Sequence, residues 1–348
     1  MTRLPHPALA SAVLLALFLP FTLEAQLDSL AELRGAATMI DATMRTHLFD
    51  PRVLATPEAA RLSARVDSLA RAATSRREFV SGFNRLWSGG PFSHVRLQRA
   101  PMSARMMLDV IDTMRVGDGA TSLRWDGTIA VMTVNTMMGA DTRERITVLY
   151  REIVERNATG LVIDLRQNAG GAFAVVPLVG HLIDRPVEGG TFLGQRWFAA
   201  NDRVPTAAEI AALTPWTGWS VTRFWGDVET NGLLRIRFEP MAPHYAGPVV
   251  VLTSGKTASA AEMATDAMLQ GGRAITMGER TAGQMLSQRM FDLVPGIHLL
   301  VPIADYHSAR MGRIEGAGIA PNVVMPAAGA LDSAVQRLRG GSARTGAP

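Results

Sequence analysis

The chain has no cysteine in its 348 residues, and Lys256 is its single lysine among 35 basic residues. The absence of cysteine excludes disulfides, a thiol nucleophile and thiolate metal sites. Aromatic residues amount to only 6% of the chain, but apolar residues reach 47%, enough for one large core or two modest ones. We therefore expect a globular protein that depends on its apolar core and not on covalent cross-links.

The formal net charge is +4, and the arginines that carry it are spread among carboxylates and apolar residues. The sequence lacks the basic runs interleaved with aromatic residues that mark nucleic-acid surfaces. It also lacks a cluster of metal-ligand residues and a phosphate-binding loop. We therefore expect no nucleic-acid partner and no cofactor.

The first residues have the pattern of an export signal. Arg3 supplies positive charge, residues 8–21 form an almost uninterrupted apolar run, and Ala25 is a small residue suited to cleavage. We predict a signal peptide over residues 1–25 and a periplasmic or secreted mature chain. The apolar run is shorter than the ~20 residues that cross a bilayer, so no membrane span is expected in the mature chain. An uncleaved N-terminal tether is the alternative.

Residues 26–90 contain three stretches in which apolar residues recur at helical spacing. Thr56 followed by Pro57 is a good start for the second helix. Ser75 and Glu78 form a capping box for the third. The sequence therefore predicts a small helical subdomain before a glycine-rich break.

From residue 129 onward the pattern changes to strands that alternate with helices. Residues 129–134 predict a strand, and Asp141 is the expected cap of the helix that follows. Residues 160–166 form a continuous apolar run, typical of a strand buried on both faces. A second unit of strand, helix and strand comprises residues 248–252, 257–270 and 274–277. The two units predict a parallel sheet and thus an α/β core.

Two stretches lie outside these units. Residues 185–246 are rich in Gly, Pro and Trp, with one short helix expected at 206–213, and we interpret them as an elaboration that covers a cleft. Residues 340–348 are expected to form a disordered tail.

Three short segments carry the residue types of a hydrolytic site. Gly170 and Gly171 follow the buried strand, where backbone N–H groups can approach a developing negative charge. Ser259 opens a helix, whose N-terminus offers further N–H groups and positive potential. His94 follows the glycine-rich break, with Ser93 beside it. Taken singly, each segment has a purely structural interpretation: the two glycines as a tight turn, Ser259 as a helix cap and His94 as a structural histidine.

Four segments, in this order, resemble motifs of the tail-specific (C-terminal-processing) protease family. Asp164–Gly171 resembles its Asp-Leu-Arg-x-Asn-x-Gly-Gly signature, and Thr257–Glu262 its Ser-Ala-Ser-Ala-x-Glu nucleophile motif. Gly278–Gly283 resembles its Gly-Glu-x-Thr-x-Gly turn, and Glu315–Asn322 its Glu-x-x-Gly-Val-x-Pro-Asp segment. The resemblance covers most of the chain and implies a crotonase-like spiral of ββα units.

The departures from these motifs indicate the branch. Gln284 stands where the C-terminal-processing branch has a lysine base, and an amide cannot act as that base. Lys256 lies outside the family position, so we expect it at a helix start or in a loop. The tricorn branch instead uses a Ser-His pair, a serine nucleophile and a glutamate. The chain matches this set, in order, with Ser93, His94, Ser259 and Glu315.

The resemblance implies a role for each of these residues. Ser259 attacks the carbonyl carbon, His94 acts as general base and then acid, and Glu315, directly or through Ser93, orients the pair. Glu279 is the alternative for the acidic member. Glu262 is expected to be structural. The expected oxyanion donors are the backbone N–H groups of Ala260 and of Gly170 or Gly171.

The resemblance also implies a division of the chain. We expect a signal peptide at 1–25, a helical subdomain at 26–90, a catalytic core at 91–328, and a C-terminal helix with a disordered tail at 329–348. Residues 97–122 are too short for the PDZ domain that the processing branch carries at this place. Substrate recognition is therefore expected to depend on the cleft itself.

The sequence predicts an exported serine peptidase that acts on proteins or peptides. A hydrophobic-ligand carrier is one alternative, because the retinoid-binding repeats of the photoreceptor matrix resemble the same fold. An esterase or other acyl hydrolase is another, since a Ser-His pair and an oxyanion hole serve esters as well as amides.

Overall fold

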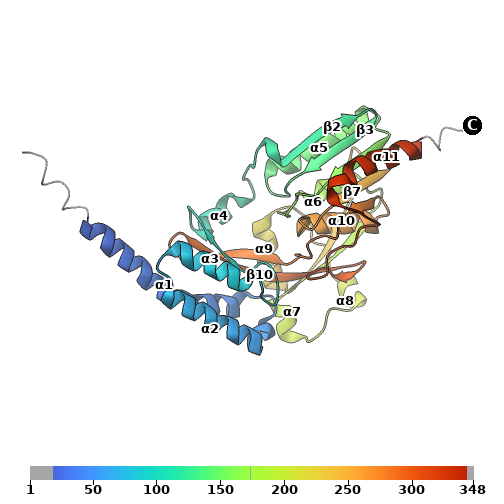
Figure 1. The fold of residues 1–348 in the computed structure, drawn as a ribbon. Coiled ribbons are helices and arrows are strands. Elements are labelled where there is room, and N and C mark those ends of the chain that lie inside the picture. The colour runs from blue at the N-terminus through green and yellow to red at the C-terminus, as the bar shows by residue number, and fades with distance from the viewer. Residues whose placement is uncertain (1–18, 173, 343–348) are drawn as a thin grey trace, which may run out of the picture.

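The computed structural model describes residues 19–172 and 174–342 (Figure 1). Most of the predicted signal peptide, residues 1–18, and residues 343–348 of the expected tail lie outside the described residues. Residues 340–342, also expected in that tail, are instead the last residues of a helix (Ala330–Ser342). Within the described ranges, none of the helices combines the length and the hydropathy that a bilayer crossing requires.

Three helices form the N-terminal subdomain: α1 (Leu19–His47), α2 (Pro57–Ala72) and α3 (Arg76–Trp87). The Thr56 side chain caps α2 by accepting from the N–H of Ala59. Ser75 caps α3, but the Glu78 carboxylate accepts from Thr74 instead of Ser75, so only half of the predicted capping box forms. The 3₁₀ helix η1 (Pro51–Ala55) joins α1 to α2.

The predicted α/β core is present as a six-stranded sheet, here called the parallel sheet. Its order is β12-β8-β7-β4-β3-β2, and all neighbours are parallel except β2 and β3. The strands are β2 (Thr121–Asp126), β3 (Ile129–Val134), β4 (Gly160–Asp164), β7 (Val249–Thr253), β8 (Ile275–Gly278) and β12 (Val323–Val324). The predicted βαβ units are confirmed.

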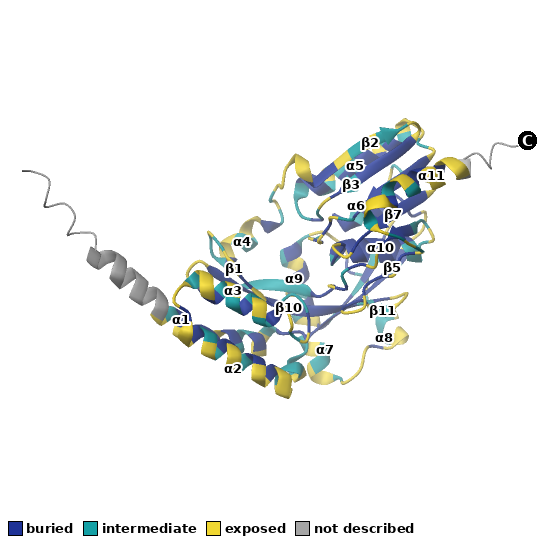
Figure 2. Ribbon diagram, viewed as in Figure 1, coloured by how far each residue is buried: buried dark blue, intermediate teal, exposed yellow. Residues whose placement is uncertain are grey.

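Helices cover both faces of the parallel sheet (Figure 1). Helices α5 (Ala140–Glu155), α6 (Val175–Gly180) and α10 (Ala260–Gln270) pack on one face, and α11 (Ala330–Ser342) on the other, after 3₁₀ helix η3 (Ala327–Gly329). The central strands β3, β4 and β7 are buried on both sides for this reason, whereas the edge strands β2 and β12 are partly exposed (Figure 2).

The start of α5 differs from the prediction. Its N-cap is Gly139, because the carboxylate of Asp141 is occupied by the N–H groups of Val116, Gly117 and Thr142. Asp141 therefore ties the segment before β2 to the helix instead of capping it.

A second, mainly antiparallel sheet was not predicted. Its path is β1-β10-β5-β6, and β9 and β11 also pair with β10. The strands are β1 (Arg96–Arg99), β5 (Val187–Gly194), β6 (Leu233–Phe238), β9 (Ser287–Val294), β10 (Ile297–Ser308) and β11 (Gly312–Arg313). The N-terminal helices pack on one face of this sheet, around Leu97, Leu299 and Val301.

The stretch 185–246 is thus part of the framework and not an added elaboration, although four of its residues line the catalytic cavity: Phe192, Val221, Phe224 and Trp225. It supplies β5 and β6, together with α7 (Gln195–Ala200), α8 (Ala207–Ala211) and α9 (Val221–Asn231). Strand β5 was not predicted because its glycines resemble a turn. A Cβ at Gly190 would lie 2.2 Å from the carbonyl oxygen of His307 on β10. Glycine is needed there for close packing of two strands, and not for a turn.

Candidate active site

Ser259 stands at the sharp turn between β7 and α10. It is the N-cap of α10, with φ 54° and ψ −123°. Across the described ranges only two other non-glycine residues have positive φ, His94 (69°) and Asn157 (52°). Such backbone conformations persist only where the surrounding structure holds them. The predicted nucleophile and the predicted base therefore both occupy strained positions.

Glu262 holds the turn around Ser259. Its side chain is fully buried and accepts from the backbone N–H of Ser259 (3.0 Å) and the hydroxyl of Thr281 (2.5 Å). The N–H groups of Gly283 and Gln284 complete a set of four donors. Burial raises the pKa of this carboxyl, although the four hydrogen bonds oppose that effect. The sequence interpretation of Glu262 as mere helix structure missed this connection.

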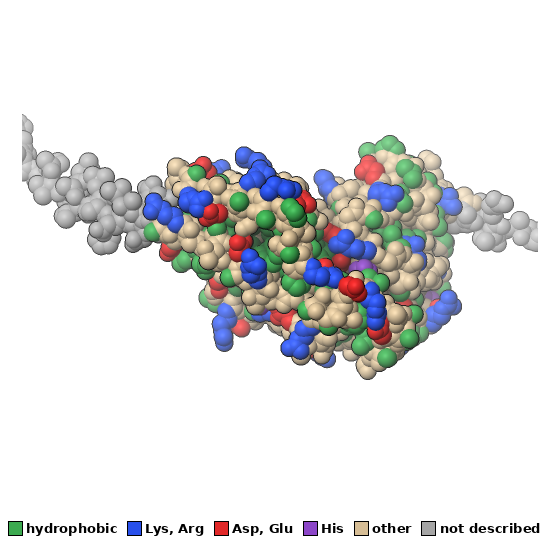
Figure 3. Space-filling model, turned by 90° about the horizontal axis from the view of Figure 1, so that it is seen from below, with side chains coloured by type: hydrophobic (Ala, Val, Ile, Leu, Met, Phe, Trp, Pro, Cys, Tyr) green, Lys and Arg blue, Asp and Glu red, His purple; other side chains and the backbone are tan. Residues whose placement is uncertain are grey.

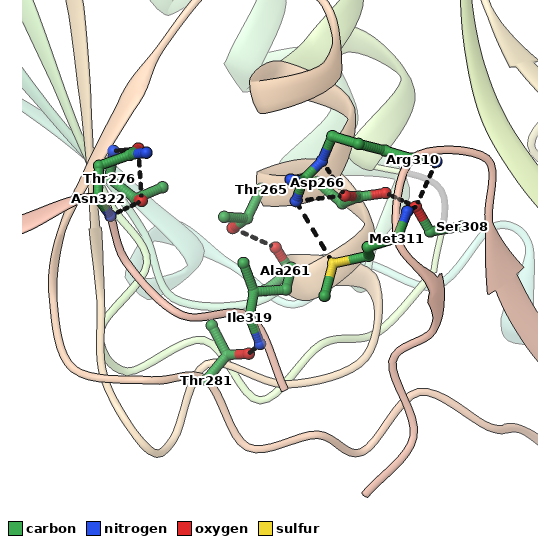
Figure 4. Close-up of polar contacts among 10 residues, drawn as sticks. All are labelled: Ala261, Thr265, Asp266, Thr276, Thr281, Ser308, Arg310, Met311, Ile319 and Asn322. Atoms are coloured by element: carbon green, nitrogen blue, oxygen red, sulfur yellow. Dashed lines mark hydrogen bonds and ion pairs between the residues drawn. The ribbon is translucent and has the colours of Figure 1, made fainter. Parts of the chain in front are cut away.

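A second carboxylate fixes the next turn of α10. Asp266 is fully buried and accepts from the hydroxyl of Ser308 (2.5 Å) and from Nε of Arg310 (2.9 Å). Figure 4 shows Ser308 and Arg310 pointing toward Asp266 from one side of the helix. The nucleophile helix is thus attached through side chains to the end of β10.

The glycine loop lies directly against Ser259. A Cβ at Gly170 (φ 96°) would lie 2.6 Å from Cβ of Ser259, so only glycine permits this approach. The N–H of Gly170 donates to Oδ1 of Asn168 (2.8 Å). By contrast, the N–H groups of Gly171 and Ala260 have no hydrogen-bond partner within the described part of the chain. Those two N–H groups are free to bind an oxyanion.

His94 is connected to Glu315 through Ser93. Nδ1 of His94 lies 2.5 Å from Oγ of Ser93, and the backbone N–H of Ser93 donates to Oε1 of Glu315 (2.9 Å). The second oxygen of Glu315, which is buried, accepts from the N–H of Met285 (2.7 Å). The carboxylate therefore binds two backbone N–H groups and reaches Ser93 through its main chain.

The imidazole of His94 is held neutral. Burial, and secondarily the positive charge of Arg96, lower the pKa of His94 from 6.5 to about 4. A neutral imidazole can accept a proton, as a general base must.

These groups meet in one cavity of about 410 Å³. Its wall contains Ser259, His94, Gly170, Gly171 and Ala260. Much of the remaining wall is apolar and includes Phe192, Phe224, Trp225, Met263, Met285 and Leu300. Over the described residues His94 and Ser259 share this wall without a hydrogen bond between them, a separation common before substrate binds.

The alternative candidates for the acidic residue and the base lie outside the cavity wall. Glu279 is exposed and accepts from the N–H of Ala327, and Lys256 is exposed and donates to Gln167. Gln284, at the family's lysine position, is also exposed. None of the three side chains is in the cavity wall formed by the described residues.

Comparison with known proteins places this arrangement in a family. A model of Peptidase family S41 matches residues 128–325. The carboxyl-terminal-processing protease of Picosynechococcus sp. is 34% identical over 116 residues, which make up 31% of this chain and 28% of that protein. The chloroplastic carboxyl-terminal-processing peptidase 1 of Arabidopsis thaliana is 24% identical over 67% of this chain and 39% of that protein. The chain thus spans well under half the length of these relatives.

The fold is shared as well. The structure of a photosystem II D1 C-terminal processing protease superposes with a TM-score of 0.50 at 14% identity, covering 86% of this chain and 93% of the other. This likeness concerns the mixed α/β fold alone. Because the family match covers more than half of the residues, the chain belongs to Peptidase family S41.

Proposed function

We propose that this chain is an exported serine peptidase in which Ser259 is the nucleophile and His94 the general base. The observation that carries the proposal is the single cavity that joins Ser259, His94 and two unpaired backbone N–H groups. The strained backbone at both Ser259 and His94 supports it, because such strain concentrates at functional sites.

The hydrogen-bond partner of His94 indicates which of its ring nitrogens bears the proton. To accept the proton of Ser259, the imidazole must have an unprotonated Nε2, so its proton must be on Nδ1. Oγ of Ser93, at 2.5 Å, is placed to accept that Nδ1–H. With Ser93 as the acceptor, His94 has the tautomer in which it is a base, and His94 returns the proton to the leaving amine.

The oxyanion donors are the N–H groups of Ala260 and Gly171. Each donor of this kind is worth about 3 kcal/mol of transition-state stabilisation. Of the two glycines proposed from the sequence, Gly171 is favoured because the N–H of Gly170 is bound to Asn168. Gly170 instead provides the close approach of the loop to Ser259.

Glu315 acts as a positioning residue. Its carboxylate holds the main chain of Ser93 on one side and that of Met285, in the cavity wall, on the other. It therefore fixes the Ser93-His94 pair, which is more than 200 residues away in sequence, against the part of the chain that follows Ser259.

The finer organisation is proposed from the sequence. We propose a crotonase-like spiral, supported by the β2-β3-α5 succession, with a helical subdomain at 26–90, a core at 91–328 and a C-terminal helix within 329–348. Export through a signal peptide at 1–25 is supported by the basic start and apolar run of the sequence. Proteins or peptides are the proposed substrates, and the names of the relatives suggest cleavage near a carboxyl terminus.

A digest of a mixed peptide library tests the function. We expect the mature protein to cleave peptides, and the Ser259→Ala and His94→Ala variants to lose this activity while retaining the parental melting temperature. Hydrolysis of a nitrophenyl ester without any peptide cleavage would indicate an acyl hydrolase instead. The apolar cavity would be that of a ligand carrier if neither substrate were hydrolysed.

A further inference from the structure

A second, smaller hollow adjoins the catalytic cavity. The two share Ile111, Met138, Ala172 and Val221 in their walls, so the hollow is a continuation of the cavity. It measures about 20 Å³, where about 10–15 Å³ is enough for one water. The hollow therefore has room for the tip of one side chain of a substrate that already occupies the cavity, and not for a separate ligand molecule.

Arg143 is the side chain with free hydrogen-bond donors in the wall of this hollow. It is the fourth residue of α5 and is half-buried. Among the described residues its guanidinium has no hydrogen-bond partner and no ion-pair partner. It stacks on the exposed indole of Trp219, with Cζ 3.4 Å from the ring centroid. Stacking on a ring leaves the N–H groups at the edge of the guanidinium free.

Three carboxylates lie near Arg143 in sequence or in the same wall, and each of them binds another group. Asp112, the residue after α4 (Ala104–Ile111), accepts from three groups at the start of α9. Asp141 accepts from three backbone N–H groups, and Glu144 is paired with a different arginine. Within the described residues Arg143 is therefore left without a counter-ion.

Burial makes this unpaired charge unfavourable. It lowers the pKa of Arg143, and the negative charge of Glu144 offsets the effect only in part. A carboxylate bound in the hollow would supply the missing negative charge and accept two parallel hydrogen bonds from the planar guanidinium. The hollow thus fits an anionic side chain better than a neutral one.

The direction of the substrate follows from the proposed chemistry. His94 gives its proton to the leaving amine, so the leaving fragment lies on the imidazole side of the scissile bond. The acyl fragment extends to the other side, past Gly171. There Gly171 pairs with Met137, and the N–H of Ala172 donates to the carbonyl of Met137 (3.2 Å). The chain after Met137 leads directly into α5, so the acyl fragment extends from the oxyanion donors toward the hollow.

We propose that Arg143 binds the carboxylate of an aspartate or glutamate in the acyl fragment, so that the enzyme prefers peptide bonds that follow an acidic residue at a short distance. The proposal rests on the proposed peptidase function. Because the acyl fragment precedes the scissile bond, the recognised anion is a side chain and not the carboxyl terminus of the substrate. Trp219 orients the guanidinium, and Asp112 fixes the loop that bears Trp219 by binding the next residue, Ser220.

Peptide binding to the Ser259→Ala variant tests the role of Arg143 without turnover. The probes are alanine- and leucine-rich octapeptides, labelled with BODIPY at the N-terminus and amidated at the C-terminus, with one glutamate or one glutamine placed at each position in turn. Fluorescence anisotropy should show that glutamate at its best position binds about 10- to 100-fold more tightly than glutamine there, the range for a charge-assisted hydrogen bond. In Ser259→Ala/Arg143→Gln the two peptides should bind equally.

Charge reversal separates a change of specificity from a general loss of binding. In Ser259→Ala/Arg143→Glu, lysine at the same position should bind more tightly than glutamate. Arg151 is the matched control: it is an exposed arginine of the same helix and lies in neither wall, so Ser259→Ala/Arg151→Gln should keep the preference for glutamate. Equal binding of glutamate and glutamine peptides to Ser259→Ala, no measurable binding of any peptide, or a preference that survives Arg143→Gln would overturn the proposal.

Mass spectrometry of the same peptides after digestion by the parental enzyme tests the side of the scissile bond. Cleavage should occur on the C-terminal side of the favoured glutamate, at a fixed distance of a few residues. A glutamate that promotes cleavage only from within the leaving fragment would contradict the proposal. Failure of the peptidase function would appear separately, as an absence of cleavage while the preference for glutamate in binding persists.

Discussion

The nucleophile and the base are held in very different ways. Ser259 belongs to the parallel-sheet half, where Glu262 and Asp266 of α10 hold this helix to neighbouring segments through buried hydrogen bonds. His94 lies on a loop between the helical subdomain and β1, and its local support is Ser93 and the distant Glu315. The nucleophile is therefore held by a scaffold of buried hydrogen bonds, whereas the base lies on a loop that is positioned by Ser93 and Glu315.

Residues of both halves line the cavity, His94 and Leu300 from one and Ser259 and Met263 from the other. On the face of the molecule seen in Figure 3, basic side chains are scattered among acidic and apolar ones. Removing the buried carboxylates that hold the Ser259 side should therefore reduce stability and activity together. Changes on the His94 side should reduce activity while leaving stability nearly intact.

The largest effect is expected for Glu262→Ala. This change leaves four donors around Ser259 without their buried acceptor, and we expect a loss of about 3–5 kcal/mol in the free energy of unfolding. Urea denaturation measures it. Glu279→Ala is the control: that carboxylate is exposed and should lose less than about 1 kcal/mol. Equal losses in the two variants would contradict the scaffold role of Glu262.

Gly170→Ala should reduce activity more than stability. Its Cβ would lie 2.6 Å from Cβ of Ser259, and displacing a nucleophile by about 1 Å lowers the rate about 100-fold. Steady-state kinetics on a cleaved peptide measures the change. Gly117→Ala separates the two causes, because Gly117 also has positive φ (85°) but no atom within 4 Å of the added carbon. An equal loss of kcat in Gly117→Ala would argue against the steric explanation.

Ser93→Ala should act on the base alone. Without Oγ, nothing holds the proton on Nδ1 of His94, and we expect kcat to fall about 10- to 100-fold with KM and melting temperature nearly unchanged. Ser93→Thr retains the hydroxyl and should recover much of the rate. A Ser93→Ala enzyme with parental kcat would remove Ser93 from the mechanism.

The smallest effect concerns pH. Because the pKa of His94 is lowered to about 4, the base stays neutral down to that pH, and kcat/KM should fall only as the pH drops through about 4. Arg96→Gln removes one cause of the shift, so its acidic limb should move to higher pH. An acidic limb near pH 6.5 in the parental enzyme would show that His94 is solvated like an ordinary histidine.

Sequence reasoning recovered the elements with strong local signals. The strands expected at 160–166 and 248–252 are present as Gly160–Asp164 and Val249–Thr253, because short continuous apolar runs are typical of strands buried on both faces. The antiparallel sheet escaped because β5 contains Gly189 and Gly190, which resemble a turn until the partner strand is known. The pairings of β10 with β1 and β5 join strands more than 100 residues apart and leave no local mark, whereas β9 and β10 are adjacent in sequence and were missed as well.

The residues of the site also divide into those with a local sequence signal and those that depend on distant contacts. Ser259 and the glycine loop stand in compact motifs, so the sequence indicated them directly. The bond from Glu315 to the main chain of Ser93, and the place of Arg96 in the cavity wall, depend on how distant strands align. For Glu262 a signal existed, a glutamate three residues after a helix start, but its four donors come from two segments.

Mass spectrometry of the protein after reaction with a fluorophosphonate tests directly whether Ser259 is the nucleophile and His94 its base. We expect one adduct, on Ser259, that forms at least about 100-fold more slowly in His94→Ala. An adduct on another serine, or labelling of Ser259 at the parental rate without His94, would contradict this expectation.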